Sequence, residues 1–573
     1  MKRFITLSVL ALSTWAAIQA CGPWERPRYD VFEVYDTNEL DSEARLAPMY
    51  AFWREYAGEN TSEWNVNELS QLSLDDLSTS DNPIVAAARA RGDSEMLAYL
   101  RHLTVYLRFA SQAATDTWQY PTRESEEKNR ATLQSIANAA RNYTGSRLKN
   151  QYALLLVRSM VHLGDAAGVV NYWNTTGSKL PDTVYKDIMR GLYAWSLLAT
   201  GERKKAINEY AEMGDMASIQ WLVYDLRGNL SGLKKEYATD AGSATLVYLV
   251  QDYINNMAGS VKNKEDYLTV YDTDEDIKTA LESNLKELES FCSFALHVVR
   301  EGKTPYPAMW QAAAGYARYL LGDTSEALKM LDKARNMAGT ERMKNNARVC
   351  RIVASTAQAD ASEAYQNYLL GELKWFVSRA QTHHDANGTP ISNYMGVLTN
   401  LTYDNLVPLY TKLGQNNLAG GLSGMMHNLE YNSYGEAYNF YCYGDYGSFI
   451  DKMSATQWIE YYNYLKGGSG TSLERWLAGK VQEIDKNTFV DLAGTKFLRE
   501  GRYAEAIPYL EQVPLEHISS QGISRYMARR SYNVDRWFKR QVVDRTWEDI
   551  FDAEAEEVST NQKLDYCREV LEL

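Results

Sequence analysis

The stretch FVDLAGTKFLREGRYAEAIPYLEQVP, Phe489–Pro514, decides the fold that this sequence predicts. Its apolar residues return every three or four positions on both sides of Gly501, which is the spacing of helices with one buried face. Gly501 can adopt the left-handed conformation that ends a helix at little cost. Gly494 and Ala506 are small, so two antiparallel helices can approach each other closely there. The stretch therefore predicts a helix–turn–helix unit whose remaining apolar faces need neighbouring units of the same kind.

The same spacing of small residues around a turn glycine recurs elsewhere in the chain. Trp310–Ala334 is a full copy, Met189–Met213 is a second, and looser copies turn at Gly164 and Gly414. The pattern resembles the tetratricopeptide (TPR) repeat, and the first of these copies fills all four of its positions, Gly315, Gly322, Ala327 and Ala334. Most copies lack the early Trp and the closing Pro of that family, and the units are unevenly spaced. The resemblance implies an all-α fold, a degenerate TPR-like α-solenoid of stacked helix pairs.

Length and composition agree with such an array. A chain of 573 residues is too long for one compact core, but a solenoid escapes this limit because each repeat packs only on its neighbours. The net charge of −14 argues against a nucleic-acid partner, since phosphate binding relies on a basic surface. The 41 Tyr and 14 Trp are numerous, and we expect most to pack between helices and others to line a binding surface.

The N-terminus carries export signals. Residues 1–20 have a basic start, a short apolar core and small residues at the end, which is typical of a secretory signal peptide. Ile18–Gly22 resembles a bacterial lipobox, which implies that the thiol of Cys21 takes a diacylglycerol and becomes the mature N-terminus; an ordinary cleavage site beside an incidental Cys is the alternative. Acyl chains would hold the chain on the membrane, since each buried methylene contributes about 0.8 kcal/mol. We therefore expect an exported outer-membrane lipoprotein of Bacteroidetes type.

The sequence after Ala20 divides into three predicted segments. Residues 21–60 are expected to form an extended tether, followed by TPR-like helical arrays over 61–261 and 262–573, with the charge-rich stretch after Lys262 as the break between them. Surface lipoproteins of Bacteroidetes often carry several acidic residues after the Cys, whereas only Glu25 is present here. The periplasmic and cell-surface faces of the outer membrane both stay open.

Motifs for catalysis or metal binding are scarce. The sequence contains no H-E-x-x-H, no G-x-S-x-G and no phosphate-binding G-x-x-x-x-G-K-[ST]. His383–Asp385 is a weak metal candidate, and the acidic run 272–276 is better explained as a solvated helix start than as a calcium loop. Cys292 and Cys350 lie on apolar stretches and are expected to be buried thiols. We expect no catalytic residue, no metal and no cofactor, although an enzyme that uses scattered residues is a third possibility.

Two functions of different classes remain. The first is a non-enzymatic, lipid-anchored scaffold whose helical surface binds another envelope protein or peptide. Four aromatic residues lie on two first helices, and whichever of them escape the core are its candidate contacts: Tyr193, Trp195, Tyr316 and Tyr319.

The second is a glycan- or nutrient-binding lipoprotein similar to the SusD-like family, which shares a lipidated Cys, TPR-type helices and many aromatic residues. The segment 430–451 is rich in Tyr and Gly, and Tyr441 and Tyr443 within it could stack on sugar rings. The start CGPWERPRYD departs from the acidic start of that family, which weighs against this alternative.

Overall fold

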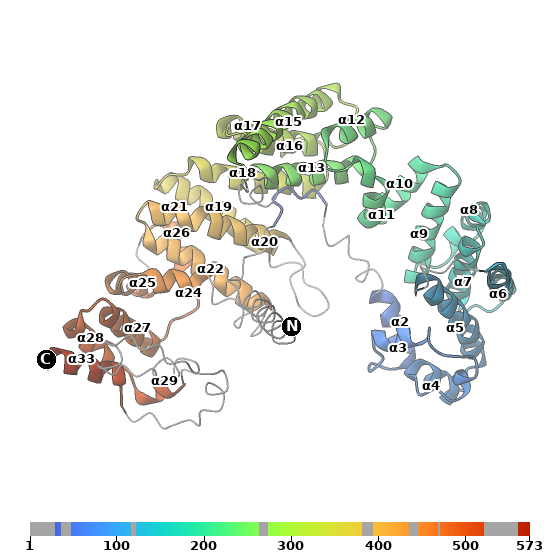
Figure 1. Cartoon of the computed structure of the whole chain (residues 1–573), viewed down its shortest axis with the longest axis horizontal. Helices are drawn as coiled ribbons and strands as arrows, with labels where there is room; N and C mark the ends of the chain where they lie inside the picture. The colour runs from blue at the N-terminus through green and yellow to red at the C-terminus, as the bar shows by residue number, and fades with distance from the viewer. Residues whose placement is uncertain are drawn as a thin grey trace, which may run out of the picture. The chain divides into compact units, whose positions relative to one another are not determined.

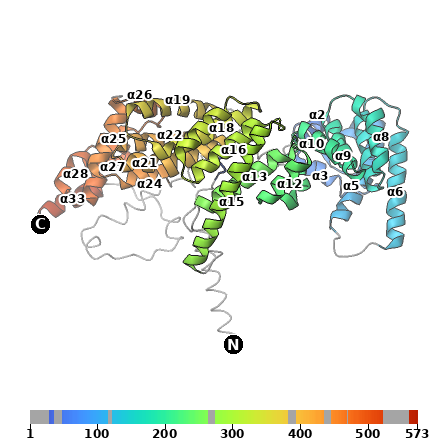
Figure 2. The same ribbon diagram turned by 90° about the horizontal axis from the view of Figure 1, so that it is seen from above.

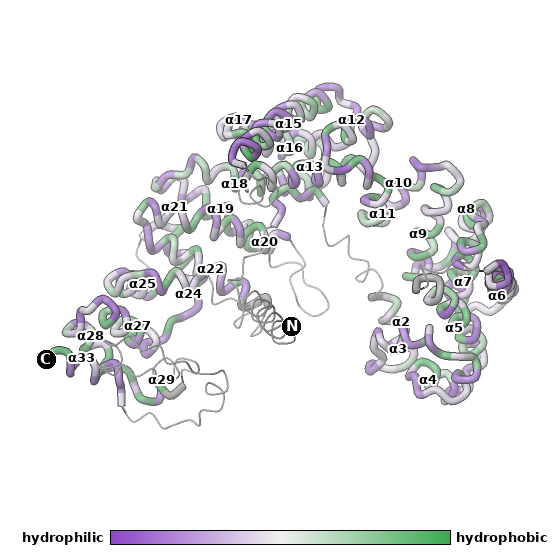
Figure 3. Tube along the Cα trace, viewed as in Figure 1, coloured by the Kyte–Doolittle hydropathy of each residue, from purple (hydrophilic) through white to green (hydrophobic). Residues whose placement is uncertain are grey.

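The computed structural model describes residues 29–35, 47–115, 122–262, 273–380, 393–434, 445–467, 470–520 and 560–572. Within these ranges all regular structure is helical, and no strand occurs in them (Figure 1). The predicted all-α class is confirmed. Green and purple segments follow one another along most helices in Figure 3, as amphipathic helices require.

The chain divides into two compact units, the second of which contains Phe32–Arg351. Its helices, in chain order, are α2 (Ala47–Ala57), α3 (Glu63–Glu68), η2 (Asp76–Ser78), α4 (Pro83–Ala90), α5 (Ser94–Thr115), α6 (Arg123–Arg141), α7 (Lys149–His162), α8 (Ala166–Thr175), η3 (Gly177–Lys179), α9 (Val184–Ala199), α10 (Arg203–Glu212), α11 (Met216–Leu222), η4 (Tyr224–Leu226), α12 (Leu230–Thr239), α13 (Thr245–Lys262), α15 (Asp274–Glu301), α16 (Pro307–Leu320), α17 (Thr324–Ala334) and the first part of α18 (Glu341–Ser355).

The other unit contains the residues before Phe32 together with Ile352 and the residues after it. After the end of α18, its helices are η5 (Thr356–Gln358), α19 (Glu363–Ala380), α20 (Asn393–Asn400), the π-helical η6 (Leu401–Leu406), α21 (Val407–Lys412), α22 (Asn416–Tyr434), α24 (Asp445–Lys452), α25 (Ala455–Gly467), α26 (Ser472–Ala478), α27 (Lys486–Arg499), α28 (Tyr503–Leu510), α29 (Leu515–Ser520) and α33 (Gln562–Glu572).

The division of the chain falls at Arg351 and Ile352, not at the charge-rich stretch after Lys262 that the sequence suggested. Both α13 and α15, on either side of that stretch, belong to the same unit and pack against each other and against α16. The described part of that stretch, from Asp274 onward, forms the mostly exposed start of the long helix α15, which projects beyond its neighbours in Figure 2, while the second half of α15 buries Phe291 and Ala295. Because the first half of α15 is mostly exposed, its composition is as charged as that of a linker between domains, which is why the sequence suggested a break there.

The predicted turn glycines are the ones that the structure uses. Five helix pairs, α7–α8, α9–α10, α16–α17, α21–α22 and α27–α28, turn at a glycine with φ between +72° and +88°: Gly164, Gly201, Gly322, Gly414 and Gly501. Residues other than glycine rarely adopt this backbone conformation. The conformation lets the chain reverse direction within a few residues.

The small residues lie where the paired helices touch. A Cβ atom on Gly494 would lie 2.5 Å from Cγ of Leu510, and one on Gly315 would lie 2.9 Å from Cγ of Leu331. Ala506 is fully buried in the same contact. These distances confirm that the paired helices approach too closely for larger residues.

The predicted helix start in the acidic run 272–276 and the two predicted buried thiols are confirmed, and a further helix start is capped by its own residues. The side chain of Asn82 accepts a hydrogen bond of 3.1 Å from the Ile84 amide and caps α4, with Pro83 as its first residue. Thr273 caps α15, and the acidic residues of its first turn meet the positive end of the helix dipole. Cys292 and Cys350 are buried free thiols.

The alanine substitution of two helical glycines should have opposite effects on stability. Gly494→Ala should lower the free energy of unfolding by about 1–3 kcal/mol, because Leu510 is buried and cannot yield to the new methyl group. Gly371→Ala, on an exposed position of α19 with no atom near its Cβ, should raise it by about 0.5–1 kcal/mol through helix propensity. Denaturant unfolding of both variants measures this, and a neutral Gly494→Ala would contradict the close contact.

Candidate functional site

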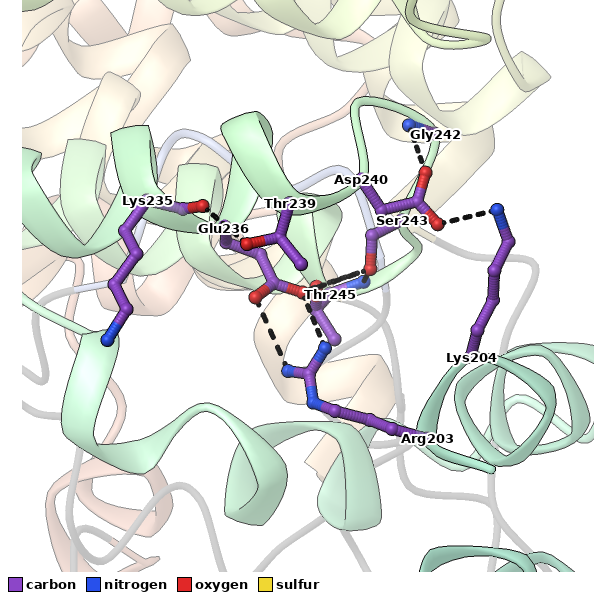
Figure 4. A network of polar contacts seen from close by, with 9 residues as sticks. All are labelled: Arg203, Lys204, Lys235, Glu236, Thr239, Asp240, Gly242, Ser243 and Thr245. Atoms are coloured by element: carbon purple, nitrogen blue, oxygen red, sulfur yellow. Dashed lines mark hydrogen bonds and ion pairs between the residues drawn. The ribbon is translucent and has the colours of Figure 1, made fainter. Parts of the chain in front are cut away.

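A buried carboxylate, Glu236, is the centre of a polar network in the Phe32–Arg351 unit (Figure 4). Both terminal nitrogens of Arg203 donate to its two oxygens, at 3.1 and 3.3 Å. The hydroxyl of Thr245 donates to Oε1 at 2.6 Å, and the hydroxyl of Ser243 donates to the same oxygen at 3.2 Å. The carboxylate thus accepts four hydrogen bonds, three at Oε1 and one at Oε2, and is held in a fixed position by them.

The network joins elements that lie apart in the sequence. Arg203 is the first residue of α10, just after the turn at Gly201, while Glu236 belongs to α12 and Thr245 begins α13. The neighbouring pair of Lys204 and Asp240, 2.9 Å apart, connects the same elements at the surface. The hydrogen bond from Lys204 holds the pKa of Asp240 below its usual value. The ion pair of Arg203 with the buried Glu236, together with the hydrogen bond from Thr245, therefore connects α10, α12 and α13. We call this set of contacts a structural joint.

A second network fixes the first helices of this unit. Arg147 donates to Asp93 and to Glu95, and the hydroxyl of Tyr56 donates to Asp93 at 2.9 Å. The hydrogen bond from Arg147 is the largest cause that lowers the pKa of Asp93 to about 2. Asp93 also accepts from the Met96 amide at the start of α5, so the ionised carboxylate is the helix cap.

Lys496, in the other unit, is the buried residue most similar to a catalytic amine. It is almost fully buried, and desolvation lowers its pKa. Its ammonium group, however, donates to three backbone carbonyls near the end of α24, those of Ile450, Asp451 and Met453, at 2.6 to 3.1 Å. A lysine whose amine donates to three carbonyls at the carboxyl end of a helix acts as a cap of that helix.

The predicted contact residues divide between core and surface. Tyr193 is buried and stacks on Trp173 with ring centroids 5.3 Å apart, and Tyr316 is buried within α16. Both are core residues, which leaves Trp195 and Tyr319 as the candidates that reach solvent; Trp195 is 41% exposed and Tyr319 is half-buried. Tyr193 is buried and Trp195 is exposed because residues two positions apart on a helix point to different faces.

The other predicted sites lie outside the described residues: Cys21, His383–Asp385, Tyr441 and Tyr443. Of the Tyr-rich segment 430–451, the described parts end α22 and begin α24, and Tyr446 is buried there with its hydroxyl 3.0 Å from that of Tyr461.

An exposed aromatic patch, which we call the α11 patch and define as Trp221, Tyr224 and Arg227, was not predicted. Trp221 is 70% exposed and Tyr224 is 59% exposed, and the guanidinium of Arg227 lies over the Tyr224 ring, 4.5 Å from its centroid. A hydrogen bond with Tyr248 raises the pKa of Arg227 and helps to hold this arginine in place. Its signal in the sequence is WLVYDLR, three large residues at intervals of three that do not fit the small-residue pattern.

No cluster of three His, Cys, Asp or Glu side chains among the described residues is arranged to hold a metal ion. None of the helices among these residues has both the length and the apolar content that crossing a membrane requires.

No known family model, curated protein or solved structure matches this chain.

Alanine substitutions at two adjacent residues of α10 should lower the free energy of unfolding by very different amounts. Arg203→Ala removes two donors from the buried Glu236 and should destabilise the protein by about 2 kcal/mol or more. Lys204→Ala removes an exposed partner of Asp240 and should cost less than about 1 kcal/mol. Thermal or denaturant unfolding decides this, and equal effects would show that the Glu236 network is not a structural joint.

The Asp93 network should make stability depend on pH in acid. Because the folded pKa of Asp93 lies below its unfolded value, its contribution is complete above about pH 4 and is lost as the pH falls towards about 2. Arg147→Met should therefore lower the melting temperature at pH 6 and lower it less at pH 2.5. Arg123→Met, which breaks an exposed pair with Glu127, is the control and should show no such change with pH.

Proposed function

We propose that this chain is a non-enzymatic scaffold of the bacterial envelope, anchored by lipid at Cys21, whose TPR-like stack of helix pairs binds another protein. The observation that carries the proposal is the α11 patch, because exposed Trp and Tyr beside an Arg are the residues that dominate binding energy at protein interfaces. Isolated surface aromatics are common, whereas this patch holds two of the most exposed aromatic rings in the described residues within four positions.

The TPR-like stack is supported by the order in which helices pack. From α6 to α17, the described helices mostly contact those next to them in the sequence, among them α6–α7, α8–α9, α9–α10, α10–α11, α12–α13, α15–α16 and α16–α17. The other unit repeats this with α19–α20, α21–α22 and α27–α28, although the contact of α19 with α26 skips several helices. Packing between sequence neighbours is the property that defines solenoids. In this chain a left-handed glycine lies in the turn of five of the helix pairs.

The absence of catalytic function in this proposal rests on how the polar residues are used. Glu236, Asp93 and Lys496 are each engaged by partners from neighbouring elements and hold helices together. The lipid anchor rests on the lipobox-like sequence Ile18–Gly22, and the outer membrane is the location that this resemblance implies.

The scaffold hypothesis predicts that an envelope protein co-purifies with the chain after mild detergent extraction, and that the α11 patch is needed for this. Trp221→Ala combined with Tyr224→Ala should reduce recovery of that protein at least about tenfold, since truncation of aromatic anchors costs about 2 kcal/mol or more. Trp64→Ala, at an equally exposed tryptophan of α3, is the matched control and should leave recovery unchanged. Quantitative mass spectrometry of the purified samples measures the effect.

The anchor is tested in the same preparation. Cys21→Ser should abolish labelling by a clickable fatty acid and release the protein from the membrane fraction. Repeated recovery of the lipidated chain alone, or unchanged recovery of its partner by the patch variant, would refute partner binding; labelling of Cys21→Ser would refute only the anchor.

A further inference from the structure

The segment Phe32–Tyr35 lies within residues 21–60, which the sequence predicts to be an extended tether. It is not exposed as a spacer would be. It forms no helix, yet Phe32 is fully buried and Glu33, Val34 and Tyr35 are nearly so. Figure 1 shows this short trace running beside α13. The segment therefore occupies a site on the helices, and its partners show what kind of site this is.

Two carboxamide side chains of α13 bind the backbone of the segment. Asn255 donates to the carbonyl of Phe32 at 2.8 Å and accepts from the amide of the same residue at 3.3 Å. Gln251, one helical turn earlier, accepts from the amides of Val34 and Tyr35 at 2.7 and 3.2 Å. A helix has no free backbone groups along its side, so these side chains supply the pairing that a strand edge supplies in other peptide sites.

Side-chain contacts add sequence selectivity to this backbone recognition. The carboxylate of Glu33 lies 2.7 Å from the guanidinium of Arg342 on α18, and the Glu33 side chain is only 7% exposed. The ring of Tyr35 lies against that of Tyr248, with centroids 6.0 Å apart. The site therefore fits an extended pattern of aromatic residue, Glu, aliphatic residue and aromatic residue.

We infer that Gln251, Asn255 and Arg342 form a peptide-binding site, and that the chain's own Phe32–Tyr35 is its occupant, acting as a latch on the tether. Gln251 is almost fully buried, so an empty site would leave its carbonyl oxygen and the site's apolar surface without partners. The latch is a separable peptide–site contact, so the same segment supplied as a free peptide binds when the cis segment is released.

The test uses the full chain, charge-reversal variants and two labelled peptides, YDVFEVYD (residues 29–36) and the same peptide with Glu33→Arg. Wild type should bind neither peptide at micromolar concentration, because the cis segment competes at an effective concentration of about millimolar. Glu33→Arg should open the latch and bind only YDVFEVYD. The double variant Glu33→Arg with Arg342→Glu should close the latch again, with hydrogen-exchange protection of the Phe32, Val34 and Tyr35 amides restored.

Lys344→Glu on the same helix is the control, since its partner Glu341 is exposed, and it should behave as wild type. Binding of neither peptide, or of both equally, to a folded Glu33→Arg chain would overturn the inference, as would unchanged protection of the three amides in that chain. Circular dichroism establishes folding. Should the single variant not fold, millimolar YDVFEVYD must speed exchange of these amides in wild type, and unchanged exchange would equally overturn the site. None of these measurements depends on lipid or on an envelope partner.

Discussion

Two helices that reverse direction within a few residues must meet face to face, and this requirement constrains the whole chain. The reversal needs a residue with positive φ, which glycine provides at Gly322 and Gly501. The close approach that follows leaves no room for a Cβ at Gly315 and Gly494. A pair built in this way still has uncovered apolar faces, so it is stable only against further helices. Both the all-helical content and the packing between sequence neighbours follow from this requirement.

This is also why so much of the fold could be predicted and so little of the site. The glycine turns and helix caps depend on residues within one or two turns of each other, so Gly201, Asn82 and Thr273 reveal them directly in the sequence. Whether Tyr193 or Trp195 faces the core depends on neighbouring helices that local spacing does not identify. The site for Phe32–Tyr35 brings together residues more than two hundred positions apart, and Gln251 and Asn255 have no pattern that marks them as ligands.

The polar residues of the described chain are used in two different ways. Glu236, Asp93 and Lys496 are buried or partly buried and have several partners each, so removing one partner leaves a charge that water cannot reach freely. Arg227 in the α11 patch and Asn255 in the latch site are more exposed and hold a ring or a backbone segment in place. Structural networks of the first kind give rigidity to the surfaces on which residues of the second kind can bind partners.

The composition of the tether argues that its buried segment has a purpose beyond spacing. A flexible spacer needs polar and small residues, whereas Phe32, Val34 and Tyr35 would expose a run of apolar surface if the tether were free. Glu33 between them is costly to bury without Arg342, so the ion pair is what allows this carboxylate to lie in the site. Under the latch proposal, the closed state gains apolar burial and the ion pair of Glu33 with Arg342, whereas the open state gains chain freedom.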